Sequence, residues 1–242
     1  MNGAVALWFR AGVVALALAV GAAHAETPLA PAPPISLISD EGEQLLMQST
    51  ARRAYGPLSA RFVTQKNLMY CGVATLVMVL NAMEIAAPPV PELEPYRTFT
   101  QDNVLDARTA AVLPPQVLLK QGMTLDQFAA LAEVHGVLAQ VHHADASSIE
   151  QFRRLASTAL ARSGHHVVVN YRRAEIGQGK GGHISPLAAY DEHSDRFLVL
   201  DVARYRYPPV WVSTADLFAA MNTPDSSNGD RRRGFVLVRT ER

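Results

Sequence analysis

The segment QKNLMYCGVATLVMVLNAMEI, residues 65–85, carries the residue best suited to nucleophilic chemistry, Cys71. Cys71 is the only cysteine of the chain, and a nearly unbroken apolar run follows it from Val73 to Met83. A run that is apolar on every side predicts a buried helix. If that helix begins at Cys71, its unpaired N–H groups and its dipole lower the pKa of the thiol and favour the reactive thiolate. The alternative is that Cys71 is a small buried hydrophobic residue.

A catalytic thiol needs a base that accepts its proton and a group that orients the base. His183 is the candidate base, because it opens an apolar strand directly after Gly181 and Gly182. The candidate orienting group is Asp201, the one charged residue in the run FLVLDVA at 197–203. A carboxylate in such a run is costly unless it is paired.

The strands that carry His183 and Asp201 are expected to form a hairpin with a five-residue loop, 191–195. In that register Tyr190 faces Arg196, and Asp201 is the diagonal neighbour of His183 on the same face of the sheet. A register shifted by one residue would put the two side chains on opposite faces. The proposed pairing of His183 with Asp201 therefore depends on the register.

Gln65 lies six residues before the cysteine, where its carboxamide can donate to the oxyanion of a tetrahedral intermediate. Taken alone, Gln65 could equally be a surface loop residue. The order of Cys71 on a helix N-terminus, then His183 and Asp201 on adjacent strands, matches papain-like thiol enzymes. In such a site the buried aspartate fixes the tautomer of the imidazole and stabilises its charged form.

The elements around these residues are predicted to be helices first and strands second, which indicates an α+β fold with a central buried helix on an antiparallel sheet. Thr124 is expected as an N-cap, Gly136 as a C-cap, and Gly56-Pro57 as a helix stop. Helices are expected over residues 41–54, 125–135, 147–163 and, behind Ser213-Thr214, 215–221. Strands are expected over 137–142, 166–171, 183–190, 196–203 and 234–239.

The run GQGKGG, residues 177–182, has the spacing G-x-G-x-x-G, but a strand follows it where a dinucleotide site needs a helix. We interpret it as a flexible loop near the active site.

The 242 residues contain 22 Lys+Arg and 22 Asp+Glu, so the net charge is zero, which argues against a nucleic-acid partner. Arg10, an apolar segment from Ala11 to Ala22 and Ala23-His24-Ala25 predict a signal peptide over 1–25, cleaved after Ala25. An uncleaved anchor is the alternative. A Pro/Ala-rich tether over 26–36 and a catalytic domain over 37–242 are expected to follow. The mature chain would be exported, most simply to the periplasm, without membrane attachment.

Several segments resemble the phytochelatin synthase family of papain-like acyltransferases. They are QKNLMYCGVATLVMVLNAMEI, PYRTFTQDNVLD, QGMTLDQFAALA, GGHISPLAAYDEHSDRFLVLDVARYRYPPVWVSTADLFAAMNT and RGFVLV. The resemblance implies that Cys71 of the YCG motif is the nucleophile, with His183 of GGHxSP, Asp201 of LDVARxxYPP and Gln65 as its partners.

The resemblance also implies the reaction. Cys71 attacks the Cys–Gly bond of glutathione, glycine leaves, and the γ-glutamylcysteinyl group passes to a second glutathione or to water. Gly72 and Gly182 are assigned to the binding of glutathione. Arg173, Arg204 and Arg233 are candidates to bind its carboxylates, because the arginine fork matches a carboxylate, and the alternative is that each is a surface charge. Arg204 and Arg233 lie inside the resembling blocks. A homodimer is an open alternative for the assembly.

Plant members of the family carry a second, cysteine-rich domain, whereas this chain has one cysteine and so no thiolate cluster for a metal. No tightly bound cofactor is expected, and cadmium or zinc would enter as a metal–glutathione thiolate substrate. Two other functions remain open at this point. One is an exported cysteine protease acting on larger peptides, and the other is a non-catalytic module that binds glutathione or a metal thiolate.

Overall fold

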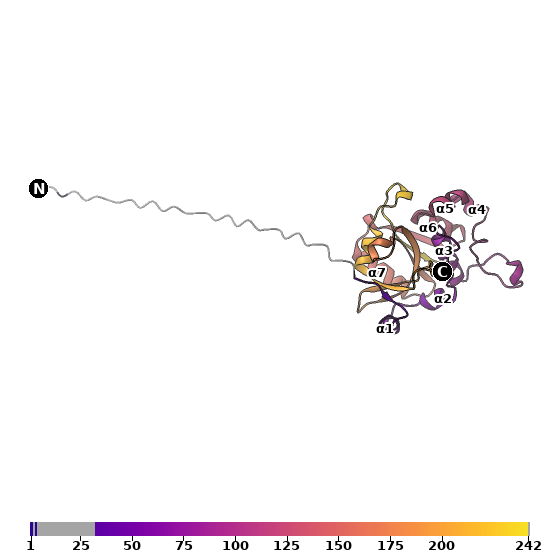
Figure 1. The fold of residues 1–242 in the computed structure, drawn as a ribbon, viewed down its shortest axis with the longest axis horizontal. Coiled ribbons are helices and arrows are strands. Elements are labelled where there is room, and N and C mark those ends of the chain that lie inside the picture. The colour runs from indigo at the N-terminus through magenta and orange to yellow at the C-terminus, as the bar shows by residue number, and fades with distance from the viewer. Residues whose placement is uncertain (2, 4–31, 242) are drawn as a thin grey trace. The chain divides into compact units, whose positions relative to one another are not determined.

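A seven-stranded antiparallel sheet organises the chain in the computed structural model, which describes residues 1, 3 and 32–241 (Figure 1). The strand order is β1-β6-β5-β4-β3-β7-β2. The strands are β1 (Ile35–Ser36), β2 (Leu138–His143), β3 (His165–Arg172), β4 (Gly182–Asp191), β5 (Arg196–Val199), β6 (Val210–Ser213) and β7 (Gly234–Arg239).

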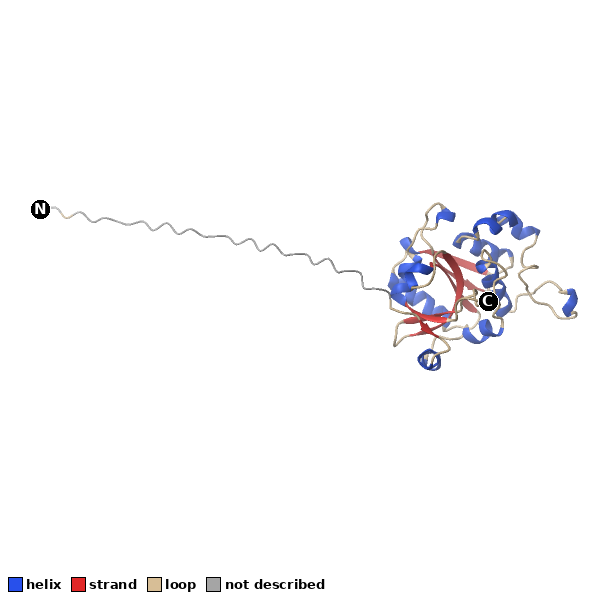
Figure 2. Cartoon of the chain, viewed as in Figure 1, coloured by secondary structure: helices blue, strands red, loops and turns tan. Residues whose placement is uncertain are grey.

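Helices lie on both sides of this sheet (Figure 2). They are α1 (Asp40–Gln48), α2 (Tyr55–Ala60), α3 (Cys71–Ala82), α4 (Ala107–Val112), α5 (Pro115–Gln121), α6 (Leu125–Val134), α7 (Ile149–Leu160) and α8 (Thr214–Met221). Short 3-10 turns are η1 (Pro91–Leu93), η2 (Ala144–Ala146), η3 (Arg173–Ile176) and η4 (Ser226–Asn228). The expected α+β class is therefore confirmed. Among the residues that the structure describes, none of these helices has the length and apolar character to cross a bilayer.

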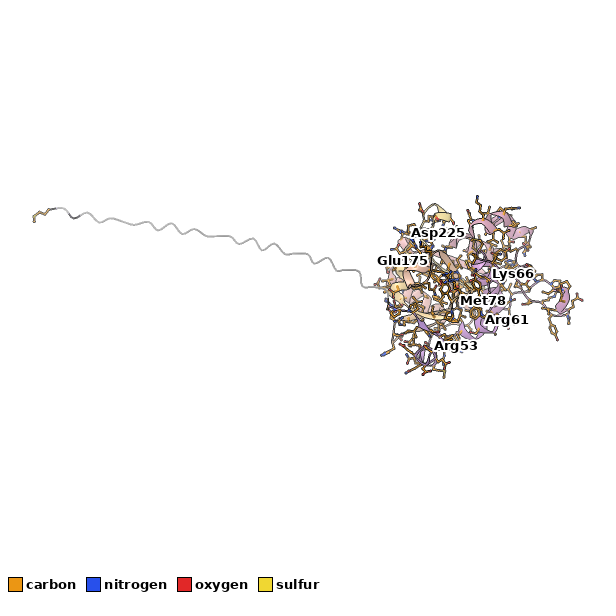
Figure 3. The ribbon with its side chains drawn as sticks, in the orientation of Figure 1. Arg53, Arg61, Lys66, Met78, Glu175 and Asp225 are labelled. Atoms are coloured by element: carbon orange, nitrogen blue, oxygen red, sulfur yellow. The ribbon has the colours of Figure 1, made fainter. Side chains whose placement is uncertain are left out.

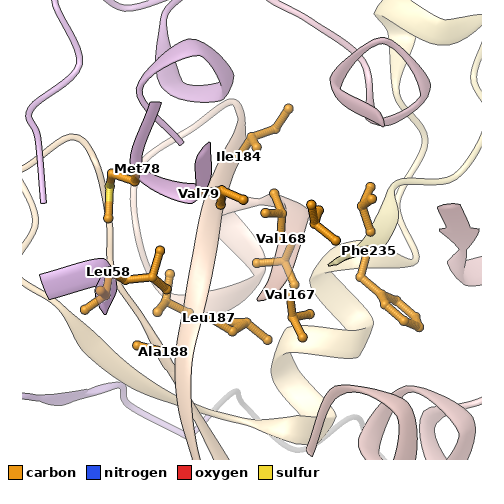
Figure 4. Packing of buried hydrophobic residues seen from close by; sticks show 14 of the residues in the cluster. Leu58, Met78, Val79, Val167, Val168, Ile184, Leu187, Ala188 and Phe235 are labelled. Atoms are coloured by element: carbon orange, nitrogen blue, oxygen red, sulfur yellow. The ribbon is translucent and has the colours of Figure 1, made fainter. Parts of the chain in front are cut away.

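The helix that begins at Cys71 is the central element of the core, as its sequence predicts. Every residue of α3 from Gly72 to Leu80 is buried. Thr75, the one polar side chain in that stretch, donates its hydroxyl to the backbone oxygen of Ile184 on β4 at 3.1 Å. This hydrogen bond satisfies a buried polar group and holds α3 against the strand that carries His183. Figure 4 shows part of the packing, with Met78 and Val79 from α3 and Leu187 from β4.

Three predicted helix starts are confirmed by their capping side chains. Thr124 accepts from the N–H of Gln127, whose side chain bonds back to Thr124, so the two form a capping box. Ser148 caps α7 and Ser213 caps α8, each with its side-chain oxygen, which accepts the N–H of Gln151 and of Asp216 respectively. Gly136 follows the last turn of α6 with φ of 81°, a conformation that favours glycine.

The predicted helix over 41–54 ends earlier, at Gln48, because the chain then pairs with the sheet. Ala51 forms a bridge with Tyr190 and accepts its N–H at 2.9 Å. Gly56-Pro57 was expected to stop a helix, and that expectation is wrong. Both residues lie in the first turn of α2, where proline is tolerated because its missing N–H would have no helical partner.

The hairpin of β4 and β5 differs from the predicted register by one residue at its turn. Asp191 faces Arg196 and Tyr190 faces Phe197, so the loop has four residues, 192–195. A β-bulge between Ala189 and Leu187 then shifts the pairing, and Leu187 faces Val199, as in the predicted register. The bulge thus restores the expected alignment at the end of the hairpin that leads to the active site.

The strand expected over 196–203 ends at Val199, and Asp201 lies just beyond it. The short strands β6 and β1 were not predicted. Apart from residues 1 and 3, the expected signal peptide over residues 1–25 lies outside the described residues, and so does most of the expected tether. Ile35 and Ser36, the last two residues of that tether, form β1 and pair with β6.

Candidate active site

Cys71 is the first residue of α3 and is half-buried, so its thiol lies at the helix N-terminus. The thiol interacts with the imidazole of His183 and with the backbone N–H groups of Ile184 and Gly72. The N–H of Gly72 belongs to the helix, as predicted, whereas that of Ile184 belongs to the strand β4.

His183 and Asp201 meet as the hairpin argument requires. His183 Nε2 lies 2.9 Å from Asp201 Oδ1, and the two side chains are 4% and 0% exposed. His183 Nε2 also lies 2.9 Å from the hydroxyl of Ser185, two residues along β4 and on the same face. Because Asp201 and Ser185 occupy Nε2, Nδ1 is the ring nitrogen that remains for the thiol of Cys71.

The electrostatics of the site favour a thiolate and an imidazolium. Burial raises the pKa of Cys71, but the hydrogen bond and charge of His183 outweigh it, and the net pKa lies below the ordinary thiol value. Burial lowers the pKa of His183, yet its bonds to Asp201 and Cys71 raise the net pKa above its ordinary value. For Asp201, burial is outweighed by His183 and Arg173, and the pKa falls well below its usual range.

Arg173 holds the far side of the same carboxylate. Its Nη1 and Nη2 donate to Asp201 Oδ2 and Oδ1 at 2.6 Å and 2.9 Å, and Arg173 is 6% exposed. The backbone N–H of Ala203 also donates to Asp201 Oδ1 at 2.8 Å. Arg173 was expected to bind a substrate carboxylate. The structure places its guanidinium on Asp201, and Arg173 is also among the residues that line the cavity over the thiol.

Gln65 lines the same cavity as Cys71, and its amide is held in place. Its Nε2 donates to the backbone oxygen of Asn67 at 2.7 Å, and its backbone N–H donates to Val202 at 2.9 Å. Gln65 Oε1 is buried and has no hydrogen-bond partner in the part of the chain that the structure describes. An amide N–H of Nε2 beyond the one used on Asn67 remains for a substrate oxyanion.

A second glutamine, which the sequence did not single out, fixes the backbone around Gln65. Gln101 Oε1 accepts the N–H of Lys66 at 2.9 Å, and Gln101 Nε2 donates to the backbone oxygen of Thr64 at 2.9 Å. Lys66 itself is labelled in Figure 3. The Gln101 side chain thus bonds the residues immediately before and after Gln65.

A cavity of about 410 Å³ opens over these residues and is lined by Cys71, His183 and Gln65. Its walls carry positive and negative side chains together with apolar ones. The remaining lining includes Lys180, Arg206, Arg233, Asn170, Asp225, Leu68, Met123 and Tyr205. Asp225 is labelled in Figure 3. This mixture suits a small, zwitterionic ligand better than an apolar one.

Arg233 and Gly182 meet in the wall of this cavity. Arg233 is 8% exposed, its Nη2 lies 3.4 Å from Asp225 Oδ1, and its Nη1 donates to Thr223 Oγ1 at 3.1 Å. A Cβ on Gly182 would lie 3.1 Å from Arg233 Nη2, so the glycine lets the guanidinium reach the cavity. Arg233, one of the candidate carboxylate-binding arginines, thus lines the cavity.

The other glycine and arginine assigned to substrate binding lie elsewhere. Gly72 does not line the cavity, and a Cβ there would lie 2.4 Å from Met123 Sδ. Arg204 lies outside the cavity as well, with its guanidinium over the ring of Phe62 and a hydrogen bond to the Phe62 backbone oxygen at 3.2 Å. The structure therefore does not bring Arg204 to the site.

One further residue of the site, Ser185, could have been found from the sequence, whereas another, Asp225, could not. Ser185 stands two positions after His183 in a strand, so the two side chains share a face. Asp225 belongs to a polar loop that only the fold brings to the cavity. Within residues 32–241 no three His, Cys, Asp or Glu side chains are grouped closely enough to hold a metal ion.

A thiol at a helix N-terminus with an imidazole and a buried carboxylate defines a cysteine-nucleophile site. Residues 25–235 match the family model for phytochelatin synthase, and the chain belongs to that family. The resemblance seen in the sequence is thereby confirmed.

The chain is similar to curated proteins of plants and a yeast. It is 33% identical over 212 residues to glutathione gamma-glutamylcysteinyltransferase 3 of Lotus japonicus, covering 86% of this chain and 43% of that protein. The chain is also 33% identical over 212 residues to glutathione gamma-glutamylcysteinyltransferase 1 of Arabidopsis thaliana, covering 86% of this chain and 42% of that protein. It is 28% identical over 192 residues to the glutathione gamma-glutamylcysteinyltransferase of Schizosaccharomyces pombe, covering 79% of this chain and 45% of that protein. The chain spans less than half the length of these relatives.

Proposed function

We propose that this protein is a papain-like thiol acyltransferase and hydrolase that acts on glutathione. The observation that carries the proposal is the contact of Cys71 with His183, whose Nε2 lies 2.9 Å from the buried Asp201. Family membership supports the choice of glutathione, since the relatives are named glutathione gamma-glutamylcysteinyltransferases.

In the first half-reaction the Cys71 thiolate attacks the carbonyl carbon of the Cys–Gly peptide bond. The carbonyl oxygen becomes an oxyanion, which an N–H of Gln65 and the backbone N–H of Cys71 stabilise. His183, protonated at Nδ1, gives its proton to the departing glycine nitrogen as the C–N bond breaks. A γ-glutamylcysteinyl thioester on Cys71 and free glycine result.

In the second half-reaction His183 takes a proton from the acceptor. If the α-amino group of a second glutathione attacks the thioester, the product is (γ-Glu-Cys)2-Gly. If water attacks, the product is γ-glutamylcysteine. Either step breaks the thioester bond and returns Cys71 to its starting form.

The charges that line the cavity complement those of glutathione, which carries two carboxylates and one ammonium group at neutral pH. Arg233 and Lys180 are suited to the carboxylates, and Asp225 is suited to the ammonium. The single cysteine of the chain is the nucleophile, so cadmium or zinc would act through metal–glutathione thiolates as acceptor substrates. We further propose that residues 1–25 direct export and are removed, which N-terminal sequencing of the exported protein would test by a start at Glu26.

Mass spectrometry of the products formed from millimolar glutathione, with and without cadmium, tests the proposal. γ-Glutamylcysteine alone would identify a hydrolase, whereas (γ-Glu-Cys)2-Gly that increases with cadmium would identify a synthase. No product under either condition would contradict the proposal and favour a binding module. Preferred cleavage of larger peptides would favour a protease.

Site variants link the activity to these residues. Cys71→Ser and His183→Ala are expected to abolish the release of glycine, because the first removes the thiolate and the second removes its base. His193→Ala is the matched control, since His193 is exposed in the hairpin loop. Glycine release near the wild-type rate in either site variant would refute the mechanism.

A further inference from the structure

Arg173 has more contacts than a partner of Asp201 alone needs. Its Nη1 bonds the side-chain oxygen of Gln178 as well as Asp201 Oδ2, and its Nη2 bonds Asp201 Oδ1. The guanidinium also lies over the ring of Tyr207, at 4.3 Å from Cζ to the ring centroid. These contacts connect the catalytic aspartate to a residue of the glycine-rich loop, residues 177–182.

The backbone of Arg173 closes the same loop. Its N–H donates to the oxygen of Gly181 at 3.0 Å, and its oxygen accepts the N–H of Gln178 at 3.1 Å. The N–H of Gly179 donates to the Tyr207 hydroxyl at 3.0 Å. The glycine-rich loop is therefore built around Arg173 and the aromatic ring that stacks on it.

The glycine-rich loop is also a wall of the substrate cavity. Lys180, Gly181 and Gly182 line the cavity next to His183. Gly177 and Gly181 adopt φ values of 73° and 107°, which favour glycine and let the loop turn sharply. One short segment thus contacts both the substrate space and Arg173, the partner of Asp201, which lines the same cavity.

We propose that Arg173 is a positioning residue that couples the glycine-rich loop to the catalytic aspartate. This inference rests on the proposed function for its biological meaning. Arg173 touches no reacting atom. It fixes the carboxylate of Asp201 by a bidentate ion pair and offsets the negative charge that His183 meets. The Gln178 carboxamide in turn fixes the guanidinium.

The positive charge of Arg173 predicts the direction in which the pKa values of His183 and Cys71 change when it is removed. Removing the positive charge of Arg173 makes protonated His183 more favourable and the thiolate of Cys71 less favourable. Loss of protons from both groups then moves to higher pH. A residue with only a packing role would change stability without moving the titration of the thiol.

The rate of Cys71 alkylation by iodoacetamide as a function of pH measures this titration in the full chain without any substrate. In Arg173→Met the profile is expected to move to higher pH by about one unit. Arg172→Met is the matched control, because it removes the same charge one residue earlier, where the side chain is 52% exposed and 3.9 Å from Glu175. An unmoved profile in Arg173→Met, or an equal shift in Arg172→Met, would overturn the inference.

Arg173→Met leaves Asp201 buried without its arginine, and this variant could fail to fold for that reason. A second variant keeps the test valid in that case. Gln178→Glu lies on the half-buried loop and places a carboxylate on Nη1, where it competes with Asp201 for the guanidinium. Its alkylation profile is expected to shift in the same direction. If it does not, the loop is not coupled to the aspartate.

The two proposals fail separately. Shifted alkylation profiles in a protein that does not act on glutathione would refute the proposed function and leave the coupling in place. Turnover of glutathione with unshifted alkylation profiles would refute the coupling and leave the proposed function in place.

Discussion

We expect the protein to lose stability at mildly acidic pH because His166 is buried, and this loss can be measured without knowing the substrate. The side chain lies on β3 and is 2% exposed, and its Nδ1 has no hydrogen-bond partner among the described residues. Burial, with a smaller contribution from the neighbouring charge of His165, lowers the pKa of His166 to about 4. In the unfolded chain the pKa of a histidine is about 6.5.

The sign follows from which state binds the proton. Between pH 6.5 and pH 4 the unfolded chain is protonated at His166 and the folded chain is not, so the free energy of unfolding falls as the pH falls. The loss is about 2 kcal/mol at pH 5 and about 3 kcal/mol below pH 4, from the difference between the two pKa values. The stabilisation is fully present above pH 6.5.

Urea unfolding of the wild type and His166→Gln between pH 7.5 and pH 5 measures this contribution, because all other titrating groups cancel in the difference. We expect the wild type to lose about 2 kcal/mol more than the variant over this range. A matched control makes the same replacement at the exposed His193. Parallel stability curves for the wild type and His166→Gln would refute the reasoning.

Two further predictions concern the walls of the site. Gly72→Ala places a Cβ 2.4 Å from Met123 Sδ, so we expect a loss of about 1–3 kcal/mol in urea unfolding. In the double variant with Met123→Ala, the total loss of unfolding free energy should be smaller than the sum of the two single losses. Additive losses would contradict the contact. Gln101→Leu removes the amide that bonds the backbone on both sides of Gln65. It is expected to lower kcat on glutathione about 100-fold with a smaller change in KM, and an unchanged kcat would contradict the role of Gln65.

The chemistry-bearing residues could be predicted because each violates its local pattern. Cys71 precedes a run that leaves no polar face, and Asp201 interrupts an apolar run in which an unpaired carboxylate is costly. That cost indicates that Asp201 has a partner, but the cost alone does not identify it. The structure supplies two, His183 and Arg173. The contact with Arg173 was not predicted, because a sequence shows the charge of an arginine but not the group it meets.

The parts that could not be predicted depend on contacts between distant segments. The bulge in β4 compensates a turn one residue shorter than expected, and period-two alternation does not reveal an extra residue. The strand β6 is four residues long and β1 only two, so neither shows a pattern of its own. The role of Gln101 arises from a loop that lies more than thirty residues from Gln65 and its neighbours in the chain.

The position of Cys71 gives the chain an internal reporter of conformational opening. It is the only cysteine, and the helix that it begins is buried from Gly72 to Leu80. A thiol reagent too bulky for the cavity can react only when this helix separates from the sheet. The denaturant dependence of that reaction would therefore give the free energy of opening at the catalytic end of the core, with no cysteine introduced or removed.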